Sequence, residues 1–177
     1  MIKNTFKDRL KEIIPLIRDY ACHMLSELST SELLWRPEGT KGRTIQSYFR
    51  HMINAEIYWL KNLDDHTFEY LSKESDFKEL KKSYLQLEDH LTNSVAKASE
   101  EQLNIRVPVF EGEELQKKGT LAWMIMRTSL HAIHHLGQIS HIRYSLENPP
   151  IKNPDVPTWS NIMDTFSFLK PENLEYK

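Results

Sequence analysis

The chain has 177 residues, a length at which one hydrophobic core buries most apolar side chains, so we expect a single domain over residues 1–177. Its 23 Lys and Arg nearly balance 25 Asp and Glu, and no apolar run approaches the roughly 18 residues of a membrane span. We therefore expect neither a nucleic-acid nor a membrane partner. The first residues lack the apolar stretch of a signal peptide, and Cys22 is the single cysteine, which predicts a disulfide-free cytoplasmic protein.

Helical periodicity predicts four long helices. Apolar side chains recur at three- and four-residue steps in residues 5–28, 44–63, 76–98 and 120–148. Pro15 interrupts the first stretch and predicts either a kink or a later start of that helix. Ser29 and Ser99 are each followed three residues later by Glu or Gln, the capping-box pattern of a short helical turn.

The remaining segments predict little regular structure. Residues 105–110 and 115–118 could form a small hairpin before the last long helix, although Pro108 removes a hydrogen-bond donor. A Pro-rich tail begins near residue 149 and contains at most one short helix, over residues 161–169. Together these elements predict an all-α fold, a four-helix bundle.

The last long helix carries an unusual stripe. At 100° per residue, His135 lies about 40° and Gln138 about 20° from His131, on a face that is apolar at both ends. Two imidazoles four residues apart can converge on one divalent ion. The alternative is a pair of core histidines that hydrogen-bond to neighbouring groups, and the spacing alone leaves both open. His134 and His141 lie about 60–80° off this face and are expected at its flank.

The second long helix offers further polar candidates. His51 lies at the flank of its apolar stripe, so periodicity alone does not nominate it as a ligand. Glu56 lies inside the stripe, either as a group that orients a metal ligand or as a charge at the edge of a wide interface. We expect Cys22, beside buried positions of the first helix, to be a core residue rather than a nucleophile.

Three segments resemble the DinB-like superfamily, which includes metal-dependent enzymes of the bacillithiol-transferase type. They are residues 28–37, 44–59 and 131–138, which read LSTSELLWRP, TIQSYFRHMINAEIYW and HAIHHLGQ. The resemblance covers roughly residues 3–147 and is strongest in the last segment. It implies an up-down-down-up bundle, a homodimer, and a metal ion held by His51, His131 and His135.

One residue departs from the family pattern. Leu136 stands where the family usually has Arg, and we expect this change to remove a surface or interface contact rather than a ligand. Gly137 is expected to allow a close helix approach. Gln138 could orient a ligand, contact a bound water, or simply close the end of the pocket.

Three neutral histidines leave a coordination position open, as in reactive metal sites. Zinc or nickel suits such ligands best, and iron or manganese is also compatible. The ion would activate either water for hydrolysis or an external low-molecular-weight thiol for transfer to an electrophile, and we favour the thiol. A non-catalytic metal-binding or stress-associated bundle is the alternative. The chain contains no Glu-x-x-His pair, no His-Glu-x-x-His and no phosphate-binding Gly-rich loop.

Overall fold

The structure is a computed structural model that describes residues 5–36, 38–39, 41–61, 68–108 and 118–165. The fold is mostly helical, with one short antiparallel strand pair. Its elements in chain order are α1 (Phe6–Met24), α2 (Thr30–Leu34), α3 (Ile45–Leu60), α4 (Phe77–Lys97), α5 (Glu100–Leu103), β1 (Arg106–Pro108), β2 (Lys118–Thr120), α6 (Leu121–Ser145) and α7 (Trp159–Thr165).

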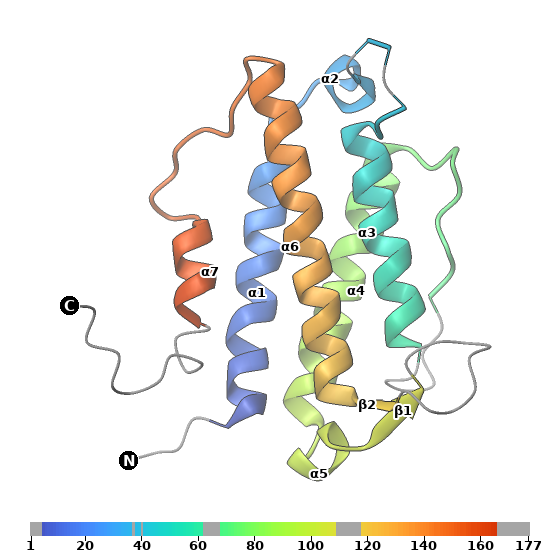
Figure 1. Cartoon of the computed structure of the whole chain (residues 1–177), viewed down its shortest axis with the longest axis vertical. Coiled ribbons are helices and arrows are strands. Elements are labelled where there is room, and N and C mark those ends of the chain that lie inside the picture. The colour runs from blue at the N-terminus through green and yellow to red at the C-terminus, as the bar shows by residue number, and fades with distance from the viewer. Residues whose placement is uncertain (1–4, 37, 40, 62–67, 109–117, 166–177) are drawn as a thin grey trace.

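The four long helices α1, α3, α4 and α6 form the predicted bundle (Figure 1). In that view α1 runs up, α3 and α4 run down, and α6 runs up, which confirms the up-down-down-up arrangement. Residues 68–76 extend along the bundle and return the chain to the upper end, where α4 begins. The helix α3 packs against α6 and α4, while α1 packs against the other sides of the same two helices.

The helices begin where the capping residues predict. Thr44 accepts a hydrogen bond from the backbone N–H of Ser47, and Thr120 accepts one from Trp123, so α3 and α6 both start at a Thr cap. Capping boxes at Ser29 and Ser99 start α2 and α5. The caps at Thr44 and Thr120 fix the starts of α3 and α6, the two helices that contain the candidate histidines.

The helix ends and the tail differ from expectation. The helix α1 continues through Pro15 and ends at Met24, four residues before the expected end, and Glu27 adopts a left-handed φ of 57°. The buried Arg143 guanidinium donates to the carbonyl oxygens of Met24 and Ser26, each at 3.1 Å, and so satisfies this helix end. The tail helix α7 starts two residues earlier than expected, and residues 166–169 lie outside the described part.

The expected hairpin region does form paired strands. The strand β1 pairs antiparallel with β2, with Arg106 opposite Thr120 and Pro108 opposite Lys118. Residues 109–117, which contain most of the predicted second strand, lie outside the described part. The described strand β2 begins at Lys118, the last residue of the expected second strand, and leads directly into α6.

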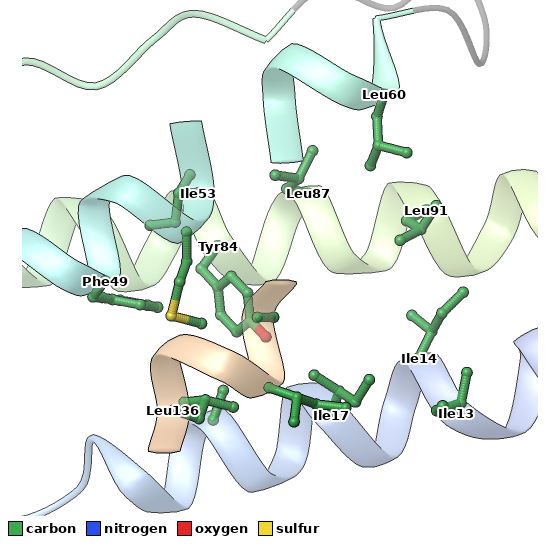
Figure 2. Packing of buried hydrophobic residues seen from close by; sticks show 14 of the residues in the cluster. Ile13, Ile14, Ile17, Phe49, Ile53, Leu60, Tyr84, Leu87, Leu91 and Leu136 are labelled. Carbon is green, nitrogen blue, oxygen red and sulfur yellow. The ribbon is translucent and has the colours of Figure 1, made fainter. Parts of the chain in front are cut away.

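The core lies between the four long helices (Figure 2). Ile17 of α1, Phe49 of α3 and Tyr84 of α4 are almost fully buried there. Full burial of an apolar side chain such as that of Ile17 or Phe49 contributes about 1.5–3 kcal/mol to the free energy of unfolding. Among the described residues, no helix is both long and apolar enough to cross a membrane.

Two expectations about α6 are wrong. Leu136 is completely buried in the core, so this position does not lie at the surface of the protein. Its position, about 140° around the helix from His131, turns it towards the core and away from the histidine face. Gly137 is exposed, and a Cβ placed on it would meet nothing within 4 Å, so no close helix approach requires this glycine.

Candidate metal centre

Three histidines converge between α3 and α6. His51 comes from α3, and His131 and His135 come from successive turns of α6. One nitrogen from each imidazole lies within 4.8 Å of the others. The Nε2 atoms of His131 and His135 are 3.0 Å apart, close to the separation of about 3.3 Å that two imidazole nitrogens have on one tetrahedral zinc ion.

The position of His51 explains why periodicity missed it. The helices α3 and α6 pack side by side, and the flank of α3 faces the histidine stripe of α6. The His51 ring lies 5.2 Å from the ring of His131 and 4.8 Å from that of His135. His51 and His131 are half-buried, whereas His135 is buried, so the cluster lies between the core and the outside.

Gln138 orients one of the imidazoles. Its Oε1 accepts a hydrogen bond from Nδ1 of His135 at 2.5 Å. Because an amide oxygen only accepts, the proton of the neutral ring lies on Nδ1, and the lone pair of Nε2 points towards the other histidines. This is the arrangement by which an outer residue fixes the tautomer of a metal ligand.

The surroundings keep the triad neutral. Burial lowers the pKa of His51, and Arg43 and His135 lower it further. Burial, followed by the nearby histidines and Arg127, lowers the pKa of His131 to about 4. Burial also lowers the pKa of His135, against the opposing effect of its bond to Gln138. Neutral imidazoles are the form that binds metal, so little proton competition is expected near pH 7.

The other sequence candidates lie outside the triad. His134 and His141 are exposed, as their predicted flank positions imply. Glu56 lies inside the apolar stripe of α3, as expected, and is buried in the core, where it lines a small cavity that it shares with Glu88 and with no histidine. Cys22 is half-buried, and burial raises the pKa of its thiol, which favours the unreactive protonated form.

Several neighbours were not expected from the sequence. The ring of Tyr48 lies 5.4 Å from that of His135, and the Arg43 guanidinium lies 6.0 Å from the Tyr48 ring. Arg127 stacks 5.0 Å from the ring of Trp59. Arg127 precedes His131 by four residues and therefore lies on the same face of α6. Helical periodicity could thus have predicted that Arg127 lies beside the histidines. Arg43 precedes its helix, where no periodicity applies.

A sequence profile of the DinB superfamily matches residues 16–139, which include all three histidines. This chain belongs to the DinB superfamily. No curated protein matches it. The membership agrees with the helical bundle, and the histidine cluster of this DinB protein has the ligands and spacing to hold a metal ion.

The donor set limits what the cluster can do. Three imidazole nitrogens suit zinc, nickel, iron or copper better than the oxygen-preferring magnesium or calcium. Among the residues that the structure describes, no further His, Cys, Asp or Glu joins the cluster. A metal ion held by these three side chains would keep at least one position for an external ligand.

Proposed function

We propose that this protein is a metal-dependent enzyme that transfers a low-molecular-weight thiol to an electrophile. The observation that carries the proposal is the convergence of three neutral imidazoles, from two helices, at a partly exposed position. A divalent ion bound by His51, His131 and His135 would act as a Lewis acid and favour the thiolate form of a thiol at the open position. Zinc or nickel fits this donor set best.

The chain's own residues prepare the site for that chemistry. Gln138 holds the Nδ1 proton of His135 and thereby directs Nε2 towards the centre. The nucleophile comes from outside, because the thiol of Cys22 is kept protonated by burial on α1 and does not belong to the histidine cluster. The half-buried position of His51 and His131 gives a small molecule access to the centre.

The test is thiol consumption by the zinc- or nickel-loaded protein, with bacillithiol, glutathione or coenzyme A and a model electrophile such as monochlorobimane. We expect the wild type to accelerate the consumption of at least one of these thiols. The rate of this consumption should be at least 100-fold lower for His135→Ala than for the wild type. His141→Ala is the matched control, since His141 is an exposed histidine of the same helix. Metal-independent turnover, or equal rates for both variants, would contradict the proposal.

Two other results would assign a different function. Hydrolysis of an ester or amide without any thiol, abolished in His135→Ala, would make the protein a hydrolase that activates water at the same open position. Bound metal without any turnover would leave a non-catalytic metal-binding bundle. Both outcomes use the same variants and therefore the same controls.

A further inference from the structure

A small cavity lies in the core between the four long helices, apart from the histidine centre. Its polar lining comes from Glu56 of α3, Glu88 of α4, and Thr128 and Ser129 of α6. The rest of its lining is apolar and consists of Ile14, Ile17, Leu91 and Ala132, the first three of which are labelled in Figure 2. Both glutamates are almost fully buried, and among the described residues no Lys, Arg or His lines the cavity.

One oxygen atom at this cavity has no partner in the described part of the protein. The Oε1 atom of Glu56 accepts no hydrogen bond from any described residue. The hydroxyl groups of Thr128 and Ser129 do not donate to it, because each already donates to a carbonyl oxygen of α6, that of Met124 at 3.0 Å and that of Ile125 at 3.2 Å. Nearly all buried acceptors bind either a protein donor or an ordered water, so this atom calls for a donor inside the cavity.

The volume of the cavity suits a ligand of one heavy atom. The centre of a water-sized sphere can move within about 10 Å³ there. A cavity holds one water when this volume is about 10–15 Å³ and two to four polar groups line it. The four polar side chains of α3, α4 and α6 meet the second requirement. A magnesium ion, which keeps several of its own waters, needs more space.

The charge of the pair favours a neutral ligand. Burial raises the pKa of Glu88 to about 8, and burial together with Glu88 raises that of Glu56 well above its usual range. Near pH 7 the two carboxyl groups are therefore mainly protonated, and a cation would find little negative charge. A water molecule can donate to Oε1 of Glu56 and accept from a protonated carboxyl group.

We propose that this cavity is a binding site for one internal water molecule, which bridges the carboxyl groups of Glu56 and Glu88. The second hydrogen of the water is directed to the hydroxyl oxygen of Thr128 or Ser129. The bound water thus joins α3, α4 and α6 through polar contacts inside an otherwise apolar core. The site is separate from the histidine centre, since no histidine lines it, and the inference does not depend on the proposed thiol transfer.

High-resolution crystal structures near pH 7 test the site directly. In the wild type and in Glu56→Gln, which keeps an oxygen acceptor, we expect one water at about 2.7–3.2 Å from that side-chain oxygen. Glu56→Met removes the acceptor and should lose the water. The control is Glu69→Gln, which changes an exposed glutamate and should keep the water. A direct hydrogen bond between Glu56 and Glu88 without water, or an ion with oxygen ligands at about 2.3–2.6 Å, would overturn the inference.

Nuclear Overhauser contacts between water and the Ala132 methyl group test the same site in solution, because Ala132 lines the cavity. We expect this contact in the wild type, Glu56→Gln and Glu69→Gln, and its loss in Glu56→Met. The hydroxyl groups of Thr128 and Ser129 remain in every variant, so a signal relayed through their protons would persist in Glu56→Met. Glu56→Gln has no carboxyl proton at this position and excludes relay through that group. Equal signals in the wild type and Glu56→Met, or no signal in the wild type, would contradict a bound water.

Discussion

At the scale of single residues, the proposed metal centre depends on the hydrogen bond between Gln138 and His135. This bond holds the Nδ1 proton and leaves Nε2 free to bind metal. We expect Gln138→Ala to lower the affinity for zinc about 10- to 100-fold, as loss of such outer partners generally does. Competition with a chromophoric chelator measures this affinity.

The conservative variant distinguishes orientation from mere packing. Gln138→Glu keeps an oxygen acceptor for Nδ1, so its affinity for zinc should equal or exceed that of the wild type. An affinity unchanged in Gln138→Ala would show that the bond does not position His135 for metal.

Helical periodicity could predict only those residues of the candidate site that belong to α6. His131, His135 and Gln138 could be found from the sequence because helical geometry fixes the angles between residues of the same helix. His51 could not be found in this way, since periodicity does not reveal which flank of α3 faces α6. The resemblance to a known family supplied it. Arg43 lies outside any helix and gave no periodic signal.

At the scale of elements, α3, α4 and α6 enclose a polar pair in the core. Glu56 of α3 and Glu88 of α4 are 3% and 4% exposed, and both line a cavity of about 10 Å³ beside Thr128 and Ser129 of α6. The Oε1 atom of Glu56 has no hydrogen-bond partner among the described residues. Burial raises the pKa of Glu88 to about 8, and burial together with Glu88 raises that of Glu56 well above its usual range.

This pair predicts that the stability of the protein falls as the pH rises. Between about pH 4.5 and pH 8 the folded state binds more protons than the unfolded state, so the free energy of unfolding decreases across this range, by on the order of 5 kcal/mol. Glu88→Gln removes one of the two titrating groups, so it should make this dependence less steep and stabilise the protein at pH 8. Urea unfolding at several pH values measures the effect.

A surface carboxylate provides the comparison for this experiment. Glu69→Gln removes an exposed glutamate and should leave the slope of stability against pH unchanged. A Glu88→Gln variant with the same slope as the wild type would show that the buried pair does not carry the expected protons.

Among the secondary-structure elements, the sequence predicts the starts of helices better than their ends. Helix starts agree with the capping residues Thr44, Ser29, Ser99 and Thr120 because a cap depends on bonds within four residues. The end of α1 was misplaced because Arg143, 119 positions later, binds the carbonyl oxygen of Met24. Leu136 was misjudged for a related reason, since its burial depends on the packing of α6 in the core.

At the scale of the whole molecule, the bundle brings distant residues together. His51 and His131 are separated by 80 positions in the chain, and they meet because α3 and α6 run in opposite directions side by side. Periodicity predicts the four long helices but not whether each runs up or down in the bundle. The up-down-down-up order was implied by the family resemblance. The extended residues 68–76, which make the two downward helices possible, had no pattern of their own.

The measurement that tests this account most directly is the metal content of the purified protein, taken by mass spectrometry after reconstitution with zinc and removal of loosely bound ions. We expect about one ion per chain in the wild type and in His141→Ala, and almost none in His51→Ala, because two imidazoles on one helix hold an ion much more weakly than three. Full occupancy in His51→Ala, or no bound metal in the wild type, would contradict the three-histidine centre.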